Sequence, residues 1–378
     1  MKRAKNHTRR IILTITAIAL GAPVVLRLAG AMLPSLEMVT AQAAMVSAGI
    51  AMPEGGLSLI EKRFKDAIVS DDASSQKSND NSKSGSQPAD DSKADSQTAS
   101  EEEPEEPVER PENAKDIVAE DFNIQSSSSM LKYGSGFLKN TTELSNAQVK
   151  EVIDKPLEMK LEKTDKPQVL IMHTHTTESY QLHSQLFYDP TYNARSTNDE
   201  QNMVSVGNKI EEQLKKAGIG VLHDTTKHDY PSYNGGYERS AETVKKYLKE
   251  YPTIQVVLDI HRDAIERDGG VRVKPVTEID GKKAAQIMII AGCDDGTMDM
   301  PNWDKNLRFA VALQDKCESM FPTLTRPIFF CYRKYNQDLT AGSLLIEMGG
   351  HANSLKEAQY SGEMVGKALA ELLTSITK

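Results

Sequence analysis

VLIMHTHTTESY, the stretch from Val169 to Tyr180, combines a buried strand with a cluster of metal-binding residue types. Its first four residues are apolar and predict a short strand inside a fold. His173 and His175 follow at once, and Glu178 comes three residues after the second histidine. The stretch therefore reads either as part of a metal or catalytic site or as an ordinary polar loop. A site of the first kind would need similar residues at the ends of other strands.

Downstream of residue 157, strand-like apolar runs alternate with amphipathic helical patterns. The expected strands are Gln168–Met172, Ile219–Leu222, Ile254–Ile260, Gln286–Ala291, Ile328–Tyr332 and Leu344–Met348, with Val271–Ile279 added at an edge. The expected helices are Val204–Ala217, Tyr237–Leu248, Trp303–Met320 and Ser354–Leu373. Because helices separate most of the strands, we expect an α/β domain over residues 157–378 with a mostly parallel sheet flanked by helices.

The first part of the chain predicts an export signal and a spacer. Residues 1–36 contain a basic head followed by a largely apolar run long enough to cross a bilayer. We interpret this run as a transmembrane anchor that leaves the rest of the chain outside the cytoplasm; a signal peptide cleaved near Ala29–Ala31 is the alternative. Residues 37–69 are then a membrane-proximal segment, and residues 70–156 a largely flexible acidic linker.

The amino-acid composition argues against nucleic acid as a partner. The 378 residues include 45 Lys and Arg against 54 Asp and Glu, a net charge of −9. An acidic chain is poorly suited to binding nucleic acid through its phosphates, so no such partner is expected. The three cysteines, Cys293, Cys317 and Cys331, lack CxxC spacing, and we expect free buried thiols.

Two further predicted strands end in polar residues. Asp259, His261, Arg262 and Asp263 lie at the end of one, and Glu347 lies at the end of the last. Ligands of open α/β sheets bind beyond the carboxyl ends of the strands. We expect His261 to bind a metal, with Asp259 or Asp263 orienting its ring; a network of Arg262 with these aspartates is the alternative. Glu347 is the candidate catalytic carboxylate.

We favour His175 over His173 as the second imidazole ligand, because the strand ends near Met172 and the following turn sends the two rings different ways. His175, Glu178 and His261 would then supply two nitrogens and one oxygen. This is the donor set of a catalytic zinc site, which leaves a fourth position for water and lowers its pKa from 15.7 to about 7. His173 would be structural or would support the ligands.

Two polar loops, YPSYNGGY (residues 230–237) and RKYNQD (residues 333–338), contain residues suited to lining a substrate groove. Tyr335 and Asn336 of the second loop are candidates for binding substrate. Asn234-Gly235-Gly236 is also a strong turn signal, so both loops could be ordinary turns.

Five motifs in this order, VLIMHTHTTESY, HDTTKHDYPSYNGGYERS, VVLDIHRDA, RKYNQDL and LLIEMGGHANS, resemble the stage II sporulation protein P family. The resemblance covers residue 168 to the C-terminus. It implies a fold similar to the zinc N-acetylmuramoyl-L-alanine amidases, whose ligands are His, Glu and His with a late catalytic Glu. His175, His261 and Glu347 match by strand order. The middle ligand matches Glu178 or, by its place before a helix, Glu200.

The resemblance also implies a function. A zinc enzyme of this family cleaves the N-acetylmuramoyl-L-alanine bond and stem-peptide cross-links of peptidoglycan. It acts with stage II sporulation proteins D and M in septal thinning and forespore engulfment, at the sporulation septum and the engulfing membrane. A non-catalytic wall-binding scaffold and a zinc carboxypeptidase remain the alternatives.

Overall fold

The computed structural model describes residues 108–123 and 130–377. The predicted anchor, the membrane-proximal segment and the linker up to residue 107 lie outside the described residues. Among the helices of the described part, none is both long and apolar enough to cross a membrane.

The main sheet is mixed, so the expectation of a mostly parallel sheet is wrong. Its order is β2-β3-β12-β11-β13-β7-β4-β6, in which β11 runs antiparallel to β13 and β2 antiparallel to β3. The bounds are β2 (Leu131–Tyr133), β3 (Gly136–Asn140), β12 (Ile328–Cys331), β11 (Ile287–Gly292), β13 (Ser343–Gly350), β7 (Val256–Asp263), β4 (Val169–Met172) and β6 (Val221–His223). The chain reaches β11 from β7 through a hairpin rather than a crossover helix, so β11 returns in the opposite direction.

That hairpin belongs to a second sheet. It consists of β9 (Val271–Ile279) and β10 (Lys282–Ala285), and the order is β10-β9-β1-β5, with β8 (Glu266–Arg267) also on β9. β1 (Lys115–Glu120) runs parallel to β9, and β5 (Phe187–Tyr188) pairs with the far side of β1. The strand expected at an edge is therefore present, but it belongs to this second sheet, where it pairs with its sequence neighbours β8 and β10 and with the distant β1.

Part of the expected linker is folded. Besides β1, residues 130–156 contain β2, β3 and α3 (Asn146–Ile153). β3 joins the main sheet beside β12, and α3 begins at a capping box between Ser145 and Gln148. β3 pairs with β12 (Leu138 with Ile328) and β1 pairs with β9 (Ile117 with Arg272), so partners distant in the sequence stabilise this part of the chain.

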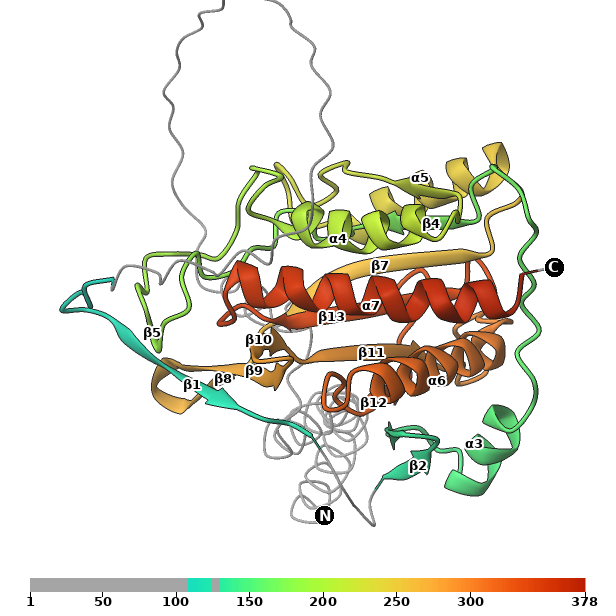
Figure 1. The fold of residues 1–378 in the computed structure, drawn as a ribbon, viewed down its shortest axis with the longest axis horizontal. Helices are drawn as coiled ribbons and strands as arrows, with labels where there is room; N and C mark the ends of the chain where they lie inside the picture. Colours follow the sequence, from blue (N-terminus) through green and yellow to red (C-terminus); the bar gives the residue numbers. More distant parts are fainter. Residues whose placement is uncertain (1–107, 124–129, 378) are drawn as a thin grey trace, which may run out of the picture. The chain divides into compact units, whose positions relative to one another are not determined.

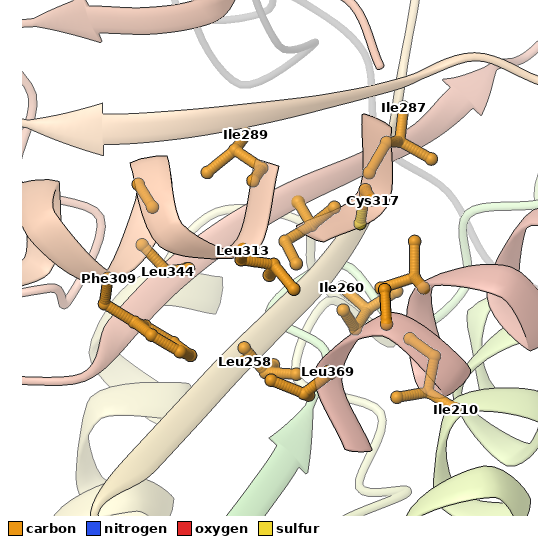
Figure 2. Packing of buried hydrophobic residues seen from close by; sticks show 14 of the residues in the cluster. Ile210, Leu258, Ile260, Ile287, Ile289, Phe309, Leu313, Cys317, Leu344 and Leu369 are labelled. Atoms are coloured by element: carbon orange, nitrogen blue, oxygen red, sulfur yellow. The ribbon is translucent and has the colours of Figure 1, made fainter. Parts of the chain in front are cut away.

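Three helices cover one face of the main sheet: α4 (Met203–Lys216), α7 (Leu355–Ser375) and α6 (Trp303–Met320) lie side by side (Figure 1). Their apolar side chains pack on alternate residues of the strands, as Figure 2 shows for Leu258 and Ile260 of β7 and Leu344 of β13. Cys317 on α6 belongs to this core, and all three cysteines are free and buried, as expected.

α5 (Gly236–Glu250) packs on the opposite face. Val244 of this helix meets Leu170 and Met172 of β4 and Val257 of β7. Because side chains alternate along a strand, Asp259 and His261 of β7 point to the same side as Val257. The face under α5 is thus apolar in its first part and polar towards the strand ends.

Candidate metal centre

Three neighbouring strands bring the site together at their carboxyl ends. β7 lies between β4 and β13 and is parallel to both. Glu347 of β13 is directly opposite His261 of β7, and β4 ends one residue before His173. This pairing places the loop that carries His175 and Glu178 next to both strands.

His175, Glu178 and His261 form a buried group whose ligand atoms all lie within 4.8 Å of one another. The distances are 3.4 Å from His175 Nδ1 to Glu178 Oε1 and 3.7 Å from His261 Nδ1 to Glu178 Oε2. Two atoms bound about 2.1 Å from a tetrahedral zinc ion are about 3.4 Å apart. The residues therefore fit a metal of this size with little movement, and the donors are those that zinc prefers.

Buried polar atoms without hydrogen-bond partners also indicate that this group suits a positively charged ligand. Within the described part of the chain, His175 Nδ1 and both carboxylate oxygens of Glu347 are buried without a hydrogen-bond partner. Buried polar groups of this kind are costly unless something binds them. Glu347 is fully buried, which is the expected setting for a carboxylate that handles protons rather than one that only forms an ion pair.

The charges of the protein itself shift the pKa values in this centre. Burial alone would raise the pKa of Glu178, but its contacts with His175 and the Arg262 charge outweigh this and lower it. Burial and the neighbouring Asp263 carboxylate raise the pKa of Glu347 well above its ordinary value. Burial opposes protonation of His261, yet Asp259 and other carboxylates raise its pKa to about 9. The centre is rich in carboxylates and attracts positive charge.

Asp259 contacts both His261 and the loop that carries His175. Its carboxylate lies 2.8 Å from His261 Nε2, an ion-pair contact whose alignment falls short of a hydrogen bond. It also accepts hydrogen bonds from the backbone N and the hydroxyl of Thr174, at 2.8 and 2.7 Å. Asp259 thus connects the His261 ring to the loop that carries His175.

Arg262 holds the same loop from the other side. Its buried guanidinium donates to the carbonyls of Ser179 and Ala194, and its backbone N donates to Glu178 Oε2 at 3.1 Å. Asp263, the next residue, pairs with Arg326 at 2.9 Å, and both are buried. Neither Arg262 nor Asp263 belongs to the group that could hold a metal.

His173 points away from this group, towards α4. Its Nδ1 lies 3.0 Å from the Ile260 carbonyl and its Nε2 lies 2.8 Å from Nε2 of His223. The close approach of α4 depends on Gly207, since a Cβ there would be 2.6 Å from the His223 ring. His173 therefore packs β4 against α4 and β6.

Aromatic rings form a wall beside the two histidines. Tyr233 stacks on His175 with centroids 4.5 Å apart, and Tyr237 lies parallel to His261 at 6.3 Å. Tyr335 adds a third ring, 5.4 Å from Tyr237. The two loops that the sequence suggested as groove linings thus both reach the centre.

The sequence did not indicate several residues that support the loop of the metal centre. Arg195 pairs with Asp229 at 2.8 Å, and Asp229 in turn accepts from Thr177, next to Glu178. Arg326 likewise arrives from a distant segment, and no local motif marks these residues. Glu200, the alternative middle ligand, is exposed on the turn before α4 and is not part of the group.

A family model and a curated relative both match the chain. A family model described as stage II sporulation protein P matches residues 42–370. The stage II sporulation protein P of Bacillus subtilis is 30% identical over 222 residues, covering 55% of this chain and 51% of that protein. The chain thus spans about half the length of the curated relative it matches.

Among solved structures, the CwlD amidase of Clostridioides difficile in complex with the GerS lipoprotein shares 11% identity, with a TM-score of 0.36 over 55% of this chain and 98% of that one. The apo N-acetylmuramyl-L-alanine amidase Ami1 of Mycobacterium abscessus shares 13%, with a TM-score of 0.33 over 56% and 99%. The family match extends over most of the sequence, including all the residues of the centre. The chain belongs to the stage II sporulation protein P family.

Proposed function

We propose that the chain is a zinc-dependent peptidoglycan hydrolase that cleaves the N-acetylmuramoyl-L-alanine amide bond and stem-peptide cross-links. The observation that carries the proposal is the buried group of His175, Glu178 and His261 beside the unpartnered carboxylate of Glu347. Family membership supports the substrate class.

Each residue of the centre has a role in this proposal. His175, Glu178 and His261 would hold the zinc ion, which when bound supplies Lewis-acid chemistry for water activation and carbonyl polarisation. Glu347 takes a proton from the attacking water on a carboxylate oxygen and returns it to the leaving amine. A buried carboxylate close to the ligands and free of other hydrogen bonds is suited to both transfers.

The chain's remaining residues orient this chemistry. Asp259 holds the His261 ring and Arg262 fixes the loop of Glu178, so the ligands are positioned before the metal binds. Tyr233 and Tyr237 cover one side of the histidines and reduce their contact with water. A scaffold that only binds cell wall has no need for a buried carboxylate without a partner.

Location and partners are part of the same proposal. The apolar run in residues 1–36 would anchor the chain, with its folded part outside the cytoplasm at the sporulation septum and the engulfing membrane. There it would act on peptidoglycan with stage II sporulation proteins D and M, in septal thinning and engulfment. Family membership and the N-terminal sequence support this assignment.

Metal analysis and digestion of purified sacculi test the enzymatic proposal together. We expect about one zinc per chain and release of stem peptides with a free lactyl group on muramic acid. Glu347→Gln should keep zinc and lose activity, whereas Glu200→Gln, an exposed control, should keep both. Absence of zinc, or released single amino acids in place of stem peptides, would contradict the amidase assignment; the second result would favour a carboxypeptidase.

A further inference from the structure

A cleft of about 430 Å³ opens next to the metal centre, and we call it the side cleft. It lies between α5, which contributes Tyr237, Glu238, Glu242 and Lys245, and the loop after β12, which contributes Tyr335 and Asn336. Its volume is in the range of sites that hold a small ligand or one part of a larger one.

Tyr237 connects the side cleft to the centre. Its ring lies parallel to the His261 ring, with centroids 6.3 Å apart, and the ring of Tyr335, which also lines the side cleft, is 5.4 Å away. A group bound in the side cleft is therefore one aromatic ring away from the metal ligands. A subsite for the part of the substrate that flanks the scissile bond would lie at such a place.

The loop wall of the side cleft is held in an unusual conformation. Tyr335 and Asn336 both have positive φ, 45° and 56°, which costs a residue other than glycine about 1 kcal/mol or more. The Asn336 side chain donates to the Tyr237 carbonyl at 2.9 Å and to Ser240 Oγ at 3.0 Å. These bonds attach the loop to the first turn of α5, so the wall is formed before any ligand arrives.

The α5 side of the cleft carries charged side chains that have no partner within the described part of the chain. Glu238, Glu242 and Lys245 occupy positions i, i+4 and i+7 of α5, hence one face of the helix, and all three are exposed. Within the described part of the chain, none of them takes part in an ion pair or a hydrogen bond. Lys334, at the other wall, already pairs with Asp338 at 3.3 Å. The available charges are therefore two carboxylates near the centre and one ammonium farther along the helix.

We propose that the side cleft binds a diamino acid of the stem peptide through the ammonium and carboxylate at the end of its side chain. Glu242 accepts the ammonium group and Lys245 pairs with the carboxylate. Their Cβ atoms, three residues apart on a helix, are about 5–6 Å from each other, so the two side chains can reach opposite charges on one carbon atom. N-acetylated sugars carry no charge for these groups to bind, which favours the peptide over the glycan.

This inference rests on the proposed hydrolysis of peptidoglycan and is tested with the intact zinc-loaded chain. Three muramoyl peptides are compared that differ at one residue: diaminopimelate, its side-chain carboxamide, and lysine, which lacks the carboxylate. We expect kcat/KM to be about fivefold higher for diaminopimelate than for the other two, the effect of one exposed ion pair.

Two variants on α5 identify the residues. Lys245→Gln should abolish the preference while leaving cleavage of the lysine peptide unchanged, and Glu242→Gln should slow all three about fivefold. Lys246→Gln and Glu250→Gln, exposed on the same helix but outside the side cleft, should behave as wild type. Equal rates in the wild type, or a preference that survives Lys245→Gln, would overturn the proposal.

Calorimetric binding of the same peptides separates this inference from the hydrolase proposal. One outcome is that no peptide is cleaved, but the diaminopimelate peptide binds more tightly than the other two and Lys245→Gln removes this difference in affinity. That outcome would refute the proposed hydrolysis and support the proposed binding in the side cleft. Equal binding of the three peptides would refute the side cleft whether or not they are cleaved.

Discussion

Asp259→Asn is expected to weaken zinc binding without unfolding the chain. The Asp259 carboxylate has three contacts: His261 Nε2 at 2.8 Å, Thr174 N at 2.8 Å and the Thr174 hydroxyl at 2.7 Å. An amide of the same shape has one oxygen in place of two. It can still accept from Thr174, but it has lost the charge that holds the His261 ring.

Replacing a group that orients a metal ligand typically lowers metal affinity 10–100-fold, or about 1.4–2.7 kcal/mol. We expect Asp259→Asn to fall in this range, since the ligands themselves stay in place. Zinc affinity is measured by competition with a chromophoric chelator, and the far-UV spectrum and melting curve of the metal-free protein monitor folding.

Asp199→Asn is the matched control, because Asp199 pairs with Lys227 near the surface and touches no ligand. Its zinc affinity should equal that of the wild type. An Asp259→Asn variant that folds normally and binds zinc as tightly as the wild type would refute the orienting role of Asp259. Loss of folding in both metal-bound and metal-free protein would show that the Thr174 contacts dominate instead.

Three further perturbations test the fold and the centre. Chelation of zinc present at 100 times its Kd should remove about 2.7 kcal/mol of stability and lower the melting temperature by about 5–10 °C; a melting curve insensitive to chelator would argue against a resident metal. Gly207→Ala places a Cβ 2.6 Å from His223 and should destabilise the fold by about 1–3 kcal/mol in urea titration, with an unchanged midpoint as the contrary result. Arg326→Met leaves the buried Asp263 carboxylate without its ion-pair partner and should lower the free energy of unfolding by about 3–5 kcal/mol. Adding Asp263→Asn should recover part of this lost stability. Equal losses of stability in the single and the double variant would mean that the two residues are not coupled.

Local patterns in the sequence were sufficient to predict most elements of the α/β fold. The helix expected over Trp303–Met320 and the strand over Val271–Ile279 have the observed bounds. Hydrophobic periodicity is a property of neighbouring residues, so it needs no tertiary information. For the same reason, polar residues at the ends of three apolar runs indicated where a site would be.

Pairing between distant segments was decided only in the folded chain. β11 runs antiparallel to β13, and β9 joins a second sheet with β1, because the direction and partners of a strand depend on the path of the connection. Within the expected linker, β3 is recognisable as a strand only through its pairing with β12.

In the candidate site, too, some features follow from the sequence and others only from the tertiary structure. The sequence by itself determined which residue types could bind a metal and that His175, Glu178, His261 and Glu347 lie close to the ends of predicted strands. Tertiary structure decided that His173 turns towards His223, that Tyr237 lies against His261, and that Asp259 reaches both His261 and Thr174. The physical reason is that orientation of a side chain beyond the end of a strand depends on the packing of neighbouring elements, which periodicity along one segment does not encode.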